Sequence, residues 1–249
     1  MDGRFVSEGE MKAHKEAHGA EGGRLLEDVI LGGQDGLVNV LGIVLGVATA
    51  TNDPKIVIIA GLSATFAESL AMAAVAYTSQ KAGQQYYQKE KKREMWEIEN
   101  DAEAEKQEIA DIYAAKGFKG KELENIVKTI TSNKQVWIDV MMSEELNLGS
   151  YEGKDPARSG VVVGISAFFG SLISLWPFFF IGTFPFISNT LSAMIAGLVS
   201  SLLVLFVAGW LKSQFTVGSK WKNGFEMMVI GGIAAIAGYV IGVLMTLFL

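Results

Sequence analysis

Five apolar stretches dominate this 249-residue chain, and each is long enough to cross a lipid bilayer. A spanning helix needs about 20 mostly apolar residues. The third and fourth stretches contain no Asp, Glu, Lys or Arg. We therefore predict an all-α, polytopic membrane protein with five transmembrane helices. The stretches are Val29–Thr51, Ile56–Tyr77, Gly160–Ile181, Ile187–Leu211 and Phe225–Leu249.

Composition excludes several other classes of protein. Charged residues make up 19% of the chain, against about 25% in soluble domains. The chain has no cysteine, which excludes disulfide frameworks, thiolate metal sites and a cysteine nucleophile. The sequence contains no Gly-x-x-x-x-Gly-Lys-Ser/Thr motif, which argues against ATP hydrolysis. We expect no required cofactor and no nucleic-acid partner.

The basic residues predict the orientation of the chain in the membrane. Lys and Arg concentrate in the head, in the long polar insert and in the turn between the last two spans. By the positive-inside rule these segments face the cytoplasm and the C-terminus lies outside. The expected organisation is a polar head (1–25), two spans (26–80), a cytoplasmic helical insert (81–157) and three further spans (158–249).

Two further expectations concern the setting of the protein. The polar head predicts no signal peptide, and the absence of cysteine with short loops favours a prokaryotic or archaeal plasma membrane. An odd number of spans favours a symmetric homodimer, because one chain cannot supply both halves of an inverted repeat. Glycines in the first span suit close helix packing: Gly32, Gly33, Gly36, Gly42 and Gly46.

The insert carries acidic residues at helical spacing. They recur at steps of 3, 4, 4 and 3, so they can share one helical face, and a break near Asn100 would still let them converge. Such a face can bind a cation, or it can simply be solvated. Further on, carboxylates stand beside thioethers, a mixed set suited to a divalent transition metal, although the methionines also suit a helical core. These residues are Glu94, Glu97, Asp101, Glu105 and Glu108, followed by Met141, Met142, Glu144 and Glu145.

Polar residues inside the first two spans are candidates for a transport pathway. Asp35 and Glu68 are ionisable groups in apolar segments, where they cost roughly 2.5–3.5 kcal/mol each. Asn39 lies one turn after Asp35, Asp28 lies seven residues before it, and Met72 lies one turn after Glu68. Two carboxylates and a thioether on neighbouring helices can pass a cation between the two sides and exchange it for protons. The alternative is that the two acids only lock helix packing.

Several motifs in order resemble the vacuolar iron transporter family from Leu26 onward. They are the Glu-Asp-Val-Ile-Leu-Gly-Gly-Gln-Asp-Gly-Leu run, Ala60-Gly-Leu, Ser69-Leu-Ala-Met-Ala, Lys92-Arg-Glu-Met-Trp-Glu, Glu105-Lys-Gln-Glu and Trp137-Ile-Asp-Val-Met-Met-Ser-Glu-Glu-Leu. The resemblance implies a homodimer of five-span subunits that moves Fe²⁺ out of the cytoplasm in exchange for protons, with Fe²⁺ captured by the insert.

The resemblance also implies roles for individual residues. The family's translocation Asp falls on Asp35 and its Met on Met72, whereas its pore Glu falls on Ala64. We interpret Glu68, one turn later, as a replacement for that pore Glu. The ligand pattern of the insert falls on Glu94, Glu97, Glu105, Glu108, Met141, Met142 and Glu145, and Asp101 and Glu144 stand as additional candidates.

The predicted function is a secondary transporter for Fe²⁺, with Mn²⁺, Co²⁺, Ni²⁺ and Zn²⁺ as competing ions. One alternative is a membrane-tethered di-iron ferroxidase, although such bundles use Glu-x-x-His pairs and the insert has no His. Another is a metal-responsive sensor. His14 and His18, four residues apart, permit a metal site in a helical head, or form a solvated pair.

Overall fold

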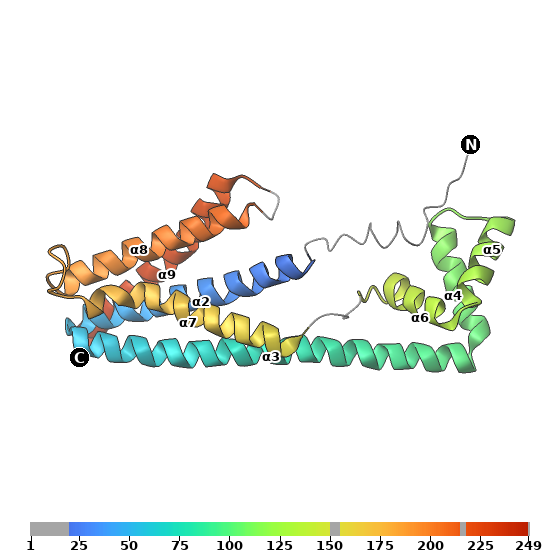
Figure 1. Ribbon diagram of the computed structural model, residues 1–249, viewed down its shortest axis with the longest axis horizontal. Coiled ribbons are helices and arrows are strands. Elements are labelled where there is room, and N and C mark those ends of the chain that lie inside the picture. The colour runs from blue at the N-terminus through green and yellow to red at the C-terminus, as the bar shows by residue number, and fades with distance from the viewer. Residues whose placement is uncertain (1–19, 150–154, 215–217, 249) are drawn as a thin grey trace. The chain divides into compact units, whose positions relative to one another are not determined.

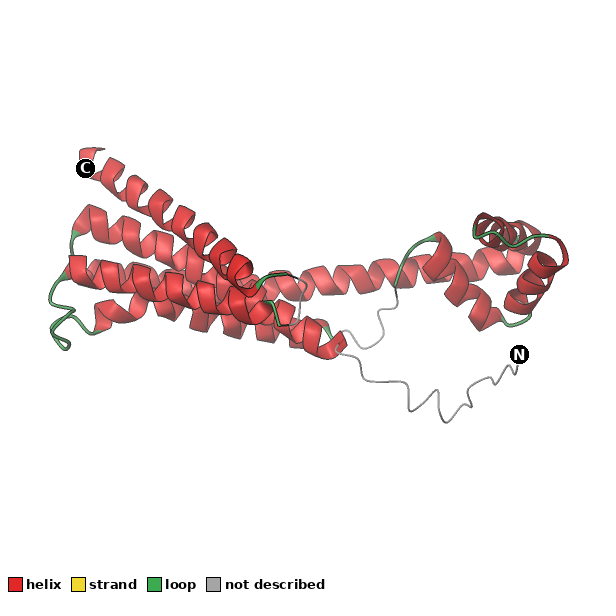
Figure 2. Cartoon of the chain, turned by 90° about the horizontal axis from the view of Figure 1, so that it is seen from above, coloured by secondary structure: helices red, strands yellow, loops and turns green. Residues whose placement is uncertain are grey.

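The computed structural model describes residues 20–149, 155–214 and 218–248, and the regular secondary structure in these residues is entirely helical (Figures 1 and 2). They divide into two compact units. One unit comprises residues up to Tyr77 together with Ala157–Leu249, and we call it the spanning unit. The other comprises Thr78–Pro156, and we continue to call it the insert. The all-α prediction is confirmed.

Within the described residues, five helices are long and apolar enough to cross a membrane, which agrees with the five predicted spans. Helix α3 continues well beyond the predicted end of its span at Tyr77, because no proline interrupts residues 78–100. It therefore contributes to both units. The helices are α2 (Ala20–Thr51), α3 (Pro54–Asn100), α7 (Pro156–Phe179), α8 (Thr190–Lys212) and α9 (Lys220–Phe248).

Helix α8 begins three residues later than the apolar pattern predicts. Asn189 caps its first turn, with the Asn189 side chain accepting from the Ser192 backbone N–H and Ser192 accepting in return. Ile187 precedes this cap, yet its side chain is fully buried in the core of the spanning unit. Burial of the side chain, rather than a helical backbone, explains its apolar character.

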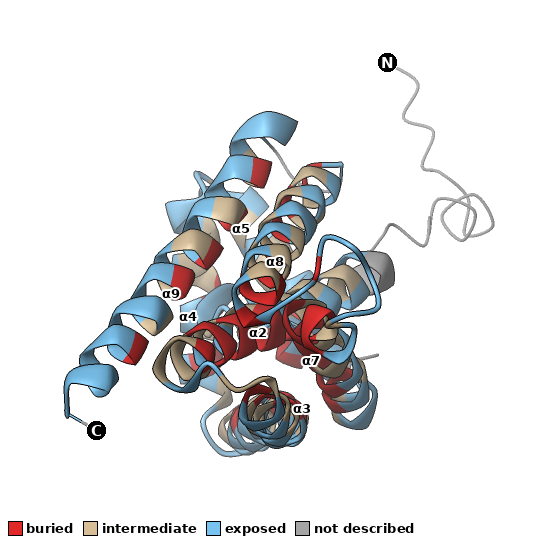
Figure 3. Ribbon diagram, turned by 90° about the vertical axis from the view of Figure 1, so that its left-hand side faces the viewer, coloured by how far each residue is buried: buried red, intermediate tan, exposed pale blue. Residues whose placement is uncertain are grey.

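Helix α2 lies at the centre of the spanning unit, where Figure 3 shows buried residues gathered on it and on its neighbours. Its core residues Val40, Leu41 and Val44 pack in one cluster with Leu175 of α7. Close approach depends on glycine, since a Cβ on Gly36 would lie 2.2 Å from the carbonyl oxygen of Ala167. The close packing expected at the glycines of the first span therefore occurs within the chain.

The insert folds around its own hydrophobic core. It contains the last part of α3, then α4 (Ala102–Ala115), α5 (Gly120–Thr131), α6 (Lys134–Val140) and a π-helix, η1 (Met141–Glu145). One helix break follows Asn100, the position that the sequence analysis considered, and the next lies at Gly117, whose φ of +105° is left-handed. The core residues are Tyr87, Ile98, Ile109, Ile130, Trp137, Ile138, Met141 and Met142.

Candidate metal-binding site

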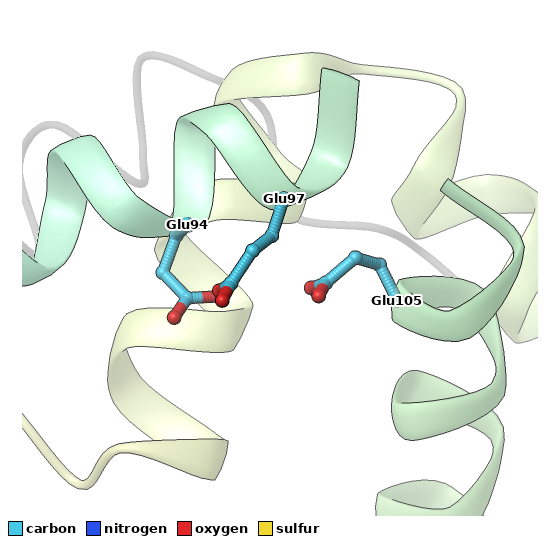
Figure 4. A group of neighbouring side chains, drawn as sticks. All are labelled: Glu94, Glu97 and Glu105. Carbon is cyan, nitrogen blue, oxygen red and sulfur yellow. The ribbon is translucent and has the colours of Figure 1, made fainter. Parts of the chain in front are cut away.

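Three carboxylates of the insert meet at the turn between α3 and α4 (Figure 4). Glu94 and Glu97 are three residues apart on α3, so they share a helical face. The break after Asn100 turns the chain back and brings Glu105 of α4 toward them. One carboxylate oxygen from each residue lies within 4.8 Å of the others. Oxygen ligands bind a divalent ion at about 2.0–2.6 Å, so two of them on opposite sides of the ion lie about 4–5 Å apart. The spacing of the three carboxylate oxygens is therefore compatible with a shared ion.

Two of these side chains are buried with an oxygen that has no partner. Glu94 is 1% exposed and Glu105 is 5% exposed. Among the described residues, neither Glu94 Oε2 nor Glu105 Oε2 has a hydrogen-bond partner. A buried, unpaired carboxylate oxygen is costly and uncommon in folded proteins. A cation bound between the carboxylates would satisfy both atoms, so the arrangement fits a cation-binding site.

Two further carboxylates interact with these three. Burial, followed by repulsion from Glu108, Glu94, Glu97 and Glu145, raises the pKa of Glu105 to about 7. Partial burial, repulsion from Glu108 and Glu94, and a hydrogen bond with Glu108 raise the pKa of Glu145 to about 7. Glu108 and Glu145 thus lie at the edge of the same group, where their side chains are exposed. Five of the predicted ligands form one electrostatic cluster, which we call the carboxylate cluster.

The two predicted methionine ligands are buried in the core of the insert. Met141 is 0% exposed and Met142 is 1% exposed, and both belong to the cluster that contains Ile109 and Trp137. They open the π-helix η1, in which the Leu146 N–H donates to the Met141 carbonyl oxygen. Short π-helical segments occur often at functional sites. The structure shows the packing role, and the ligand role stays a prediction.

The structure does not bring every predicted residue of the insert into the carboxylate cluster. Asp101 is exposed between α3 and α4, and it makes no side-chain cap hydrogen bond to α4. Glu144 forms an ion pair with Lys116. Neither residue is among the three carboxylates that meet, because helix spacing alone does not tell which acids face inward, and both ligand roles stay predictions. His14 and His18 lie outside the described residues.

In the spanning unit, the structure brings together three of the predicted pathway residues. The Glu68 side chain on α3 forms hydrogen-bonding contacts with the side chains of Asp35 and Asn39 on α2. Met72 follows one turn later and is half-buried. Ala64 packs against the apolar core. The acidic side chain one turn after Ala64 is therefore the one that faces Asp35.

Asp28 has a different partner from the other pathway residues. Its Oδ1 accepts a hydrogen bond of 2.9 Å from the Ser159 hydroxyl. Ser159 belongs to the first turn of α7 and is buried. Asp28 thus links α2 to α7, a packing contact that the sequence did not predict.

Sequence reasoning also missed two residues beside the carboxylate cluster. Glu90 is 6% exposed and lies one turn before Glu94 on α3. Arg93 forms ion pairs with Glu90, Glu94 and Glu97. The sequence pattern could have identified Glu90, because Glu90 lies four residues before Glu94 and so extends the acidic face at the same helical spacing.

The fold and these residues define a multi-pass integral membrane protein that carries a carboxylate cluster in a helical insert. The chain belongs to the VIT family, which matches residues 26–243. It is 34% identical over 235 residues to the vacuolar iron transporter of Plasmodium berghei (strain Anka), covering 93% of this chain and 86% of that protein.

Plant proteins are similar to the chain to almost the same degree. Vacuolar iron transporter 1 of Arabidopsis thaliana is 31% identical over 226 residues, which are 91% of this chain and 88% of that protein. Vacuolar iron transporter 1 of Tulipa gesneriana is 30% identical over 233 residues, which are 94% of this chain and 92% of that protein. These relatives come from eukaryotes, so they give no support to the expected prokaryotic plasma membrane.

Proposed function

We propose that the protein is a secondary transporter that moves Fe²⁺ out of the cytoplasm in exchange for protons. The names of its relatives support iron as the ion and transport as the activity. The observation that carries the proposal is the buried pair of unpartnered oxygens on Glu94 and Glu105. A buried carboxylate oxygen without a partner is uncommon in folded proteins, and a bound cation would supply the partner of both oxygens.

The insert captures the ion in this proposal. The carboxylate cluster supplies several negative charges within a small volume, which raises the local concentration of cations. Glu105 and Glu145 have pKa values of about 7, so they exchange protons for metal near neutral pH. Mn²⁺, Co²⁺, Ni²⁺ and Zn²⁺ compete with Fe²⁺, because carboxylate sites discriminate weakly among these ions.

The contact between α2 and α3 carries the ion through the spanning unit. Two neighbouring carboxyls in an apolar layer are stable when they share a proton or bind a cation. Glu68 and Asp35 are neighbours of this kind, with Asn39 as a neutral oxygen donor. Binding of a metal ion displaces the proton, and release of the ion restores it. We assign Glu68 the role of the pore Glu whose position Ala64 occupies, with Met72 one turn further along.

The proposal includes a homodimer, in which a second copy completes the pathway, with the head and the insert in the cytoplasm and the C-terminus outside. The ferroxidase alternative is weaker, since the insert contains no His for the Glu-x-x-His pairs of di-iron bundles. The sensor alternative does not explain why two carboxyls face each other between apolar helices.

The test is Fe²⁺ uptake into sealed proteoliposomes with and without a pH gradient. We expect gradient-dependent uptake by the wild type and its loss in Asp35→Asn. Glu68→Gln should reduce coupling to protons while metal binding by the insert is retained. The matched control is Glu27→Gln, which removes an exposed carboxylate from the same helix as Asp35. Absence of flux under every gradient, with metal still bound by the insert, would favour the enzyme or sensor alternative.

A further inference from the structure

Arg93 holds a positive charge against the carboxylate cluster. Its Nη2 lies 3.1 Å from Glu94 Oε1, and its Nε lies 3.6 Å from Glu97 Oε2. Both glutamates are members of the group of three that fits a metal ion. An arginine remains protonated under all ordinary conditions. The guanidinium therefore competes with a divalent ion for the negative charge of Glu94 and Glu97.

The same guanidinium reaches a third carboxylate outside that group. Arg93 Nη2 lies 3.3 Å from Glu90 Oε2. The Glu90 side chain is only 8% exposed, and its other ion-pair partner is Lys89, at 3.9 Å. Glu90 thus offers a buried negative charge next to the cluster that can hold Arg93 away from the ligands.

Helix geometry lets Arg93 change partners without movement of the backbone. Glu90 precedes it by three residues and Glu97 follows it by four, so both lie within reach along one face of α3. The Arg93 side chain is 48% exposed, which leaves it free to adopt other rotamers. The unpartnered Glu94 Oε2 shows that Arg93 satisfies the ligands only in part.

We propose that Arg93 is a resident counter-ion of the carboxylate cluster, and that binding of a divalent ion moves it from Glu94 and Glu97 onto Glu90. This inference rests on metal binding by the insert, which is part of the proposed function. Glu90 and Arg93 together then set the affinity of the cluster. Arg93 keeps the ion-free carboxylates from repelling one another, and Glu90 stabilises the guanidinium once the metal has replaced it.

The proposal predicts opposite effects on Co²⁺ affinity of two variants that each remove one charge. The assay is calorimetric titration of the full-length protein in detergent with Co²⁺ alone. Arg93→Gln removes the competing charge, so affinity should rise about three- to tenfold, given Coulomb energies at such distances in a partly solvated site. Glu90→Gln leaves Arg93 with only the ligands as partners, so affinity should fall about threefold. The double variant should behave like Arg93→Gln, because Glu90 acts only through Arg93.

The control is Lys134→Gln, which removes an equal charge from the Lys134–Glu99 pair of the same unit and should leave affinity unchanged. Unchanged or weaker binding by Arg93→Gln overturns the proposal, since it would make Arg93 a purely structural residue. If that variant does not fold, Glu90→Gln decides, and affinity equal to or above wild type overturns the proposal. A wild-type protein that binds no Co²⁺ overturns metal binding itself, a distinguishable result.

Discussion

Neutralising Glu105 should stabilise the insert in the absence of metal while weakening its metal binding. The Glu105 side chain is 5% exposed, and burial with four neighbouring carboxylates raises its pKa from 4.5 to about 7. At about 1.4 kcal/mol per pKa unit, this difference corresponds to about 3 kcal/mol. The raised pKa means that the folded insert is destabilised when Glu105 carries its negative charge. The contribution of Glu105 to the stability of the insert is therefore fully present below about pH 4.5 and is lost as the pH rises through 7.

Glu105→Gln removes the charge and keeps the shape of the side chain. Burial of the amide has a cost of its own, so we expect a net gain of about 2 kcal/mol at pH 8 in EDTA. Local opening measured by amide hydrogen exchange should then be about 30-fold less frequent for α4. Comparison of variants at one pH cancels the intrinsic exchange rates.

The matched control is Glu103→Gln, on the same helix, where an exposed carboxylate pairs with Lys106. It should leave exchange unchanged within about threefold, because exposed ion pairs contribute little. With saturating Co²⁺ the amides of α4 should exchange more slowly in the wild type than in Glu105→Gln, because only the wild type binds the metal tightly. Equal or faster exchange in metal-free Glu105→Gln than in the wild type at pH 8 would refute the inference that the Glu105 charge destabilises the folded insert.

Three further predictions concern pH, the core and helix packing. Co²⁺ affinity of the insert should fall as the pH drops from 8 to 6, with protons released on binding, because Glu105 and Glu145 must lose protons near pH 7; titration in two buffers of different ionisation enthalpy measures this. Met142→Ala should destabilise the insert by about 2–5 kcal/mol and Met142→Leu by under about 1.5 kcal/mol, as measured by chemical denaturation. If Met142 is a metal ligand, both variants should instead lose Co²⁺ affinity to the same extent. Gly36→Ala should lower the thermal unfolding temperature strongly, while Gly232→Ala, with open space around it, should not.

The sequence by itself determined the features that depend on local periodicity. Apolar runs located the five spans, because each must match the thickness of a bilayer. The steps between the acidic residues of the insert predicted one shared helical face, because helix spacing decides which acids lie on the same side. Whether that face binds a cation or is solvated was left open by the sequence.

Only the tertiary structure decided which side chains meet across helices. Asp28 and Asp35 lie on one face of α2, yet one contacts Ser159 and the other contacts Glu68. That choice depends on how α3 and α7 are rotated and shifted against α2, which backbone packing at glycines sets. Likewise, burial of Glu90 beside Arg93 depends on the folding of the insert around α3. A sequence pattern specifies the face of a helix, but the neighbouring helix specifies what that face contacts.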